Sequence, residues 1–86
     1  MASGYILIAV EPTTELDVYG ALLKLKMAIE VCPVLGPVDF IVKVKADDLN
    51  DIATLVIKHI RVIPGVTSTK TFVEDEFLKN MRKMVE

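Results

Sequence analysis

Residues 38–46 read VDFIVKVKA, and this stretch decides the fold of the chain. Side chains of a strand alternate between the two faces of a sheet. One face then holds Val38, Phe40, Val42, Val44 and Ala46, and the other holds Asp39, Ile41, Lys43 and Lys45. Alternation of this kind predicts a strand with one buried face. Such strands are typical of antiparallel sheets that are covered on one side.

Three more strands are indicated around this one. Residues 5–10 form a continuous apolar run that ends at Glu11-Pro12, which predicts a strand buried on both faces. The run is too short for a membrane-spanning helix and lacks the positive charge of a signal peptide. Residues 28–35 predict an edge strand because of Pro33, and Gly36-Pro37 is the turn that follows. Residues 67–73, rich in β-branched side chains, predict the last strand.

Two helices are predicted between the strands. The first covers about residues 14–25, with Thr14 as its cap and an apolar face of Leu16, Tyr19, Leu22 and Leu23. The second begins after Asp47 and Asp48, which supply its cap, and ends at the turn Ile63-Pro64-Gly65-Val66. Its apolar positions follow helical spacing and are Leu49, Ile52, Ala53, Val56, His59 and Ile60.

The order strand-helix-strand-strand-helix-strand defines an α+β, ferredoxin-like βαββαβ fold, an antiparallel sheet with both helices on one face. At 86 residues the chain has room for one domain. Residues 1–74 are predicted to form it. Residues 75–86 predict a C-terminal amphipathic helix whose apolar stripe is Phe77, Leu78, Met81, Met84 and Val85.

One face of the predicted sheet has no cover. The first strand is apolar on both sides, and Ile41 and Val73 are expected to add to the uncovered face. Hydrophobic residues make up 52% of the chain, a heavy load for so small a body. Exposed apolar patches usually mark interfaces. The sequence therefore predicts a homodimer paired through its sheets, a dimeric α+β barrel.

Several classes of function are disfavoured by composition. The net charge is −2 and the basic residues are scattered, so direct nucleic-acid binding is not expected. One cysteine and one histidine build neither a disulfide nor a zinc site, so no metal or cofactor is expected and a reducing cytoplasm fits. No phosphate-binding glycine loop occurs. Cys32 is interpreted as a small buried residue and His59 as a packing or rim residue, so no catalytic residue and no enzyme are predicted.

The remaining polar groups cluster near strand ends. Thr69 and Thr71 lie two residues apart, so both hydroxyls project from one face. Together with the carboxylate of Asp39 they have the chemistry to hold the carboxylate and ammonium groups of an amino acid. The structural alternative is that Gly36 serves a turn, Asp39 caps a hairpin and the threonines are simply good strand residues.

These motifs together resemble a known family. Gly36-x-x-Asp39, the Asp-capped helix, the Ile-Pro-Gly-Val turn and Thr69-x-Thr71 are similar to the effector-binding (RAM) domain of the Lrp/AsnC feast/famine regulators, over about residues 4–74. Members normally carry an N-terminal helix-turn-helix, so the chain looks like the stand-alone RAM proteins. Two positions depart from the family pattern, Val38, where an aromatic is frequent, and Pro37 in the turn.

The resemblance implies a dimer built through the sheets, often assembled into a ring of dimers, with amino acids bound between dimers. By the same resemblance, the backbone at Gly36 approaches the ligand, Asp39 takes its ammonium group, and Thr69 and Thr71 donate hydroxyls. The expected function is a regulatory amino-acid-binding module, without a DNA-binding segment or a membrane anchor, that acts through oligomerisation.

Two other functions stay open. One is an assembly module that pairs with full-length Lrp/AsnC regulators and binds no ligand. The other is a small enzyme of the dimeric α+β barrel type, which would need an acid–base residue inside the cavity between the sheets. The positions of His59 and Asp39 relative to that cavity separate the enzyme from the other two.

Overall fold

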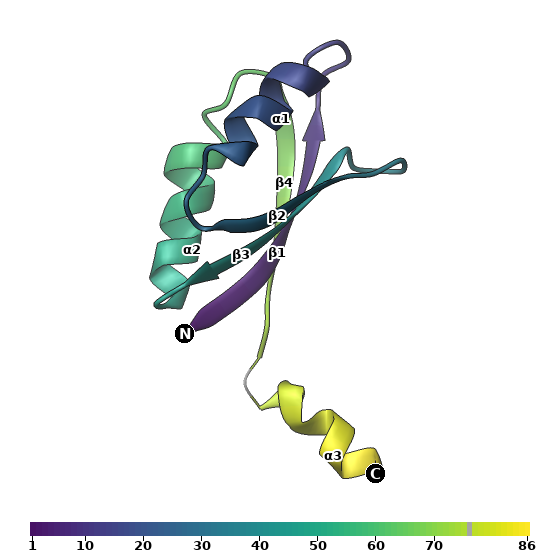
Figure 1. Ribbon diagram of the computed structural model, residues 1–86, viewed down its shortest axis with the longest axis vertical. Helices are drawn as coiled ribbons and strands as arrows, with labels where there is room; N and C mark the ends of the chain where they lie inside the picture. Colours follow the sequence, from purple (N-terminus) through teal and green to yellow (C-terminus); the bar gives the residue numbers. More distant parts are fainter. Residues whose placement is uncertain (76) are drawn as a thin grey trace.

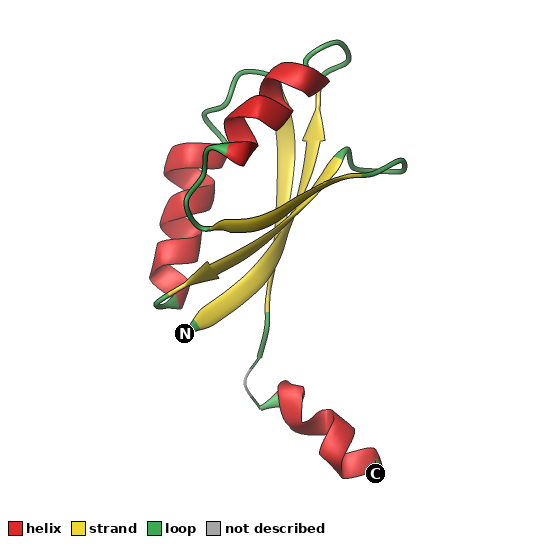
Figure 2. Ribbon diagram, viewed as in Figure 1, coloured by secondary structure: helices red, strands yellow, loops and turns green. Residues whose placement is uncertain are grey.

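The computed structural model describes residues 1–75 and 77–86. Among them is one four-stranded antiparallel sheet of order β2-β3-β1-β4. Its strands are β1 (Ala2–Val10), β2 (Ala28–Pro33), β3 (Phe40–Ala46) and β4 (Val66–Val73). The helices α1 (Glu15–Leu23) and α2 (Leu49–Leu55) lie on one side of it (Figures 1 and 2). The predicted ferredoxin-like fold is confirmed.

Two elements extend this arrangement. The helix α2 continues without a break as a π-helical turn, η1 (Val56–Ile60), in which Arg61 N donates to Val56 O at 2.9 Å. After β4, the chain leaves the sheet and forms η2 (Leu78–Asn80) and α3 (Met81–Val85), which project away from the domain (Figure 1). We call η2 and α3, with the preceding Phe77, the tail helix.

The hydrophobic core fills the space between the helices and the sheet. It consists of Ile6, Ile8, Val18, Leu22, Phe40, Val42, Val44, Ile52, Leu55, Val56 and Ile60. At its edge the ring of Tyr19 stacks on that of Phe40, with 5.8 Å between centroids. Each fully buried aliphatic side chain contributes about 1.5–3 kcal/mol, so this layer supplies most of the stabilisation. The predicted alternation of residues 38–46 is confirmed from Phe40 onward.

The first helix differs from its prediction in two ways. Thr14 occupies the cap position, but its hydroxyl donates to Glu11 O at 2.7 Å and caps no helical N–H. The preceding turn, in which Thr13 has φ of 74°, directs the hydroxyl backwards. Leu16 and Leu23 are exposed, and the buried stripe is instead Val18 and Leu22, which lie one helical turn apart.

The second helix is closer to its prediction. Asp48 caps it as expected, since its carboxylate accepts from Asp51 N at 3.0 Å. The predicted apolar face was too wide. Its exposed members are Leu49, Ala53 and His59. Leu55, which that face omitted, is buried.

The face of the sheet opposite the helices is open. The strand register places Leu7 beside Ile41 and Tyr5 beside Phe72 on this face. Val73 was expected here and is wrongly predicted, because it pairs with Gly4 and therefore points to the helix side. We define the open face by Tyr5, Leu7, Ala9, Ile41, Lys43, Lys70 and Phe72.

The strand at one edge of the sheet is short and irregular. The register of β2 shifts between Ala28 and Glu30, and the strand ends at Pro33. Cys32 pairs with Ile41, so it lies at the open face and is exposed. Its predicted burial is therefore wrong in the single chain, because the helices cover the other face of this strand.

The last strand is joined to the tail by a small polar cluster. Glu74 N donates to Ser3 O at 2.9 Å, and Ser3 Oγ donates to Glu74 Oε1 at 2.9 Å. Lys79 Nζ lies 3.3 Å from Glu74 Oε2. The Ser3 hydroxyl and then the Lys79 ammonium stabilise the carboxylate, so the pKa of Glu74 is lowered from its ordinary value of 4.5.

The first prediction concerns this cluster. A carboxyl whose pKa is lowered on folding contributes stability above its unfolded pKa and loses that contribution as the pH falls through the folded pKa. We expect an NMR titration of the Glu74 side chain to give a pKa below 4.5. Ser3→Ala should move the pKa upward, because it removes the main hydrogen bond. An unchanged pKa in this variant would contradict the assigned contact.

The second prediction concerns the turn before β4. Gly65 has φ of 103°, and a Cβ there would lie 2.6 Å from Thr14 Oγ1. Its carbonyl accepts from Glu11 N at 2.7 Å, so the turn cannot move freely. We expect Gly65→Ala to lower the free energy of unfolding by about 1–3 kcal/mol in denaturant titrations.

Gly20→Ala is the matched control for this variant. Gly20 is helical, with no atom within 4 Å of an added Cβ, so this substitution should stabilise by up to about 1 kcal/mol. Equal effects of the two substitutions would show that the Gly65 turn is not constrained.

Candidate functional site

Asp39 lies where the hairpin between β2 and β3 meets the end of β1. Its backbone N donates to Ile8 O at 2.8 Å, and its carbonyl accepts from Val34 N at 2.9 Å. Its carboxylate Oδ2 accepts from Val10 N at 2.8 Å. Among the described residues, the other carboxylate oxygen has no hydrogen-bond donor. Asp39 thus has a structural role and one oxygen left for a ligand.

The hollow beside Asp39 is largely apolar. It has a volume of about 400 Å³ and is lined by Glu15, Leu16, Tyr19, Pro33, Val34, Leu35, Asp39 and Phe40. Leu16 and Leu35 are both strongly exposed at its rim. A volume in the range of about 300–1,000 Å³ with few polar groups is usual for small-molecule sites. This hollow therefore suits a ligand with an apolar side chain and a cationic group.

Gly36 lies at the exposed tip of the same hairpin. A Cβ added there would have no atom within 4 Å, so nothing in the single chain approaches this backbone closely. Gly36 is not among the residues that line the Asp39 hollow. The predicted contact between Gly36 and a ligand would therefore require a ligand that reaches the hairpin tip from the solvent side.

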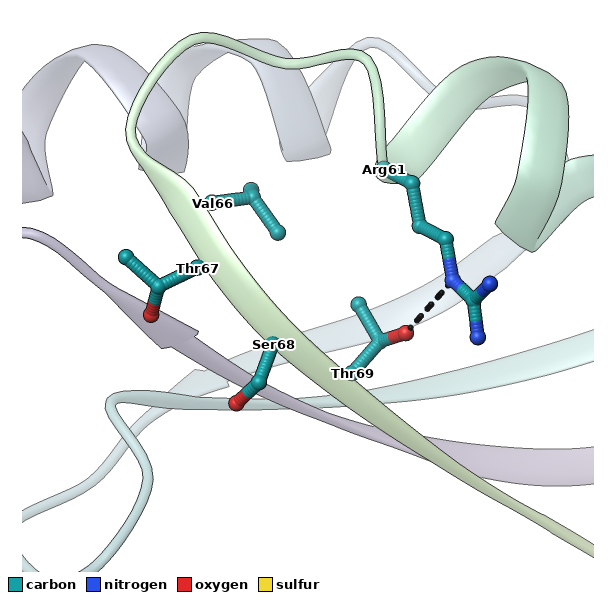
Figure 3. Close-up of a pocket in the computed structure, with 5 residues that line it drawn as sticks. All are labelled: Arg61, Val66, Thr67, Ser68 and Thr69. Carbon is teal, nitrogen blue, oxygen red and sulfur yellow. Dashed lines mark hydrogen bonds between the residues drawn. The ribbon is translucent and has the colours of Figure 1, made fainter.

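Thr69 and Thr71 lie on the helix-covered face of β4, opposite Ile8 and Ile6 of β1. Thr69 Oγ1 accepts from Arg61 Nε at 3.1 Å (Figure 3). Arg61 and Thr69 line a groove of about 460 Å³ together with Val66, Thr67 and Ser68. Thr71 lines a different hollow, under α2. The two threonines share a face but not a pocket.

The four predicted ligand residues are therefore not brought together within one chain. Asp39 and Thr69 lie on opposite sides of the same β1 residue, Ile8, one through β3 and the other through β4. Thr71 and Gly36 lie in two further places. A site that used all four would need residues from more than one copy of the chain.

Arg61 is a polar residue of this region that sequence reasoning left out. It follows η1 directly, and the turn at residues 63–66 returns the chain so that Arg61 reaches Thr69. Within the described residues, no carboxylate pairs with its guanidinium. The signal in the sequence was an arginine at the end of a helix, eight residues before a strand threonine. Such a separation has no local periodicity that would reveal it.

His59 lies apart from the predicted ligand residues. His59 is exposed and lines a hollow of the helix layer with Leu55 and residues 24–27, on the side opposite the open face. In the described part of the chain, no three His, Cys, Asp or Glu residues are grouped so that they could hold a metal ion. No helix among residues 1–75 and 77–86 is long and apolar enough to span a membrane.

The family described as Lrp/AsnC ligand binding domain matches residues 3–84 of the chain. Among solved structures, FFRP-DM1 is 31% identical, with a TM-score of 0.83, over 87% of this chain and 100% of that one. Comparison with curated proteins gives no match.

Two larger proteins share the fold. Escherichia coli AsnC is 19% identical over 85% of this chain and 50% of its own, with a TM-score of 0.80. A transcriptional regulator of Neisseria meningitidis, solved as a complex with L-Met, is 12% identical over 87% of this chain and 50% of its own, with a TM-score of 0.78. The chain spans about half the length of each.

Proposed function

The chain belongs to the Lrp/AsnC ligand-binding domain family, and from that premise we propose that it binds an amino acid and acts through self-association. Family membership already makes it a regulatory effector-binding module. The proposal adds the class of ligand and the way in which binding has an effect. The cytoplasm remains the compartment that we propose, from the single free cysteine.

The observation that carries the proposal is the position of the Asp39 carboxylate. One of its oxygens is held by Val10 N, which fixes the orientation of the group. Asp39 also lines the apolar hollow with Tyr19 and Leu35, and its other carboxylate oxygen accepts no hydrogen bond from the described residues. An ammonium group on that oxygen and an apolar side chain in the hollow would satisfy both parts of the surface. The Neisseria regulator in complex with L-Met supports an amino acid of this kind.

The remaining ligand contacts would come from a second copy. Gly36 stands at an exposed hairpin tip, and Thr69 and Thr71 lie in other hollows of the same chain. We therefore propose a site between copies, to which one chain contributes Asp39 and another contributes the hydroxyls of Thr69 and Thr71. A ligand in such a site stabilises the assembly, because it binds the associated form only.

Self-association is proposed to use the open face. Tyr5 and Phe72 form an exposed aromatic pair, with Leu7 and Ile41 beside them. A two-fold axis brings the same patch of both copies together, so a single apolar patch serves both sides. Rings of dimers, as the family resemblance implies, would then leave the Asp39 hollow between dimers.

An assembly module without a ligand is the second candidate. It is favoured by the separation of the four ligand residues within the chain, because nothing in one copy alone forms a complete pocket. In that case the chain would pair with full-length regulators of its family.

An enzyme is less well supported, because His59 lies in the helix layer and is remote from a cavity between sheets.

The third prediction tests the ligand. The test is a titration of the protein with each of the twenty amino acids, in which the midpoint of thermal unfolding and the mass by light scattering are measured. An apolar amino acid should raise the midpoint, because it binds only the folded, assembled form. Asp39→Asn keeps an acceptor for Val10 N but removes the charge, and should weaken binding by about 10- to 100-fold.

Asp17→Asn is the control, because this exposed carboxylate of α1 lines none of the hollows described above. It should leave binding unchanged. If no amino acid changes either the midpoint or the mass, the ligand-binding proposal fails and the assembly module is favoured.

The fourth prediction tests the open face. Ile41→Lys places a charge at the centre of the apolar patch, so it should abolish pairing through the open face and lower the mass measured by light scattering. Leu23→Lys is the control, because Leu23 is 56% exposed and lies on α1, away from the open face and from the Asp39 hollow. An Ile41→Lys protein with the wild-type mass would show that the sheets do not pair.

A further inference from the structure

The tail helix has an apolar stripe that its own domain leaves uncovered. Phe77, Leu78, Met81, Met84 and Val85 are all exposed. The tail helix projects from the end of β4, clear of the helices and the sheet (Figures 1 and 2). A helix of so few turns is not stable in water without tertiary contacts. The stripe therefore requires a surface to pack against.

A groove of matching character runs between α2 and β4. It has a volume of about 190 Å³, and its apolar lining is Leu49, Ile52, Ala53, Val56, Ile57 and Val73. Leu49 is 55% exposed and Ile57 is 58% exposed, so the apolar walls face solvent. The groove lies beside β4, which is an edge of the sheet. Its chemistry fits the apolar side of an amphipathic helix.

The two ends of the groove carry opposite charges. Asp47 and Asp48 immediately precede Leu49 at the start of α2, and Arg61 lies at the other end, after η1. Because Arg61 contacts Thr69 near the beginning of β4, α2 runs antiparallel to β4. The acidic end of the groove is thus the end at which β4 finishes and the tail departs (Figure 1).

The tail helix has the same polarity of charge. Asp75 precedes the apolar stripe, whereas Arg82 and Lys83 lie in its last turn. Arg82 pairs with Glu86 at 3.2 Å within the tail, so Lys83 is the cation that the tail offers to the groove. Packed antiparallel to α2, it would bring Lys83 to the acidic end of the groove and Asp75 to Arg61. Packed parallel to α2, it would bring like charges together at both ends. Charge and helix dipoles therefore both favour the antiparallel orientation.

A chain cannot place its own tail in that orientation. The tail leaves β4 at the acidic end, so a tail that folded back would run parallel to α2. Glu74 is also fixed by its two bonds to Ser3 and directs the chain away from the groove. A second copy has neither restriction. The open face is a worse alternative for the stripe, because Lys43 and Lys70 on it would meet the basic end of the tail.

We propose that the tail helix of one copy packs in the groove between α2 and β4 of a second copy, antiparallel to α2. The exchange covers two exposed apolar surfaces at once and adds contacts that do not depend on the open face. It goes beyond the proposed function, since it assigns a partner surface to residues 77–85. Thr71 also lines this groove, so a docked tail helix and a ligand held by Thr71 would compete for it.

Cross-linking in the full chain tests the exchange directly. Met81→Cys in the stripe and Ala53→Cys in the groove are combined with Cys32→Ser, which removes the native thiol. Mild oxidation should give a species of twice the chain mass on a non-reducing gel. A disulfide within the monomer would mean that the chain covers its own groove, and the absence of any disulfide would mean that the tail does not dock there. Either result overturns the proposal.

Leu23→Cys with Met81→Cys is the matched control, because Leu23 is 56% exposed but lies outside the groove. It should give little cross-linked dimer. A charge exchange in the Met81→Cys and Ala53→Cys background gives a second test. Asp47→Lys and Lys83→Asp should each lower the yield of cross-linked dimer, and their combination should restore it. No recovery in the double variant would overturn the proposed orientation.

The result separates this proposal from the pairing of sheets. With Ile41→Lys in the background, pairing through the open face is lost, whereas tail exchange should still give the cross-linked dimer. A cross-link that disappears in this background would mean that the tail has no docking surface of its own. Wild-type mass in Ile41→Lys together with a good cross-link would instead show that the tail, and not the sheet, holds the assembly.

Discussion

The central strand β1 must be covered on both faces, and the helices cover only one. It lies between β3 and β4 and is antiparallel to both. On one side Ile6 and Ile8 are fully buried under α1 and α2. On the other side Leu7 lies in the middle of an open apolar face. The same strand thus supplies part of the core of one copy and part of the surface on which the proposed assembly depends.

The fold could be read from the sequence because its strongest signals are local. The alternation of residues 38–46 and the apolar run at residues 5–10 each specify a strand without knowledge of its neighbours. The face of the last strand could not be read in this way. A shift of one residue exchanges the two faces, and the register depends on the pairing of β4 with β1, in which Gly4 lies opposite Val73. These two strands lie far apart in the sequence, so Val73 was placed on the wrong face.

The candidate site was predictable in its residue types but not in its arrangement. A carboxylate at a hairpin and two threonines on one face follow from turn and strand patterns. The position of Arg61 against Thr69 does not, because it needs the geometry of the turn at residues 63–66. Nor does the sequence give the separation of Asp39, Thr69 and Thr71 over three hollows. The roles of these residues towards a ligand remain predictions.

The irregular strand β2 limits how copies of the chain can combine. Its register shift near Ala28 and its end at Pro33 interrupt the ladder of free N–H and C=O groups at that edge. An interrupted edge is a poor template for a further strand, whereas a regular one invites open-ended addition. Contacts between faces related by a two-fold axis are complete after two copies. The shape of one short strand thus favours a particle of finite size over a fibre.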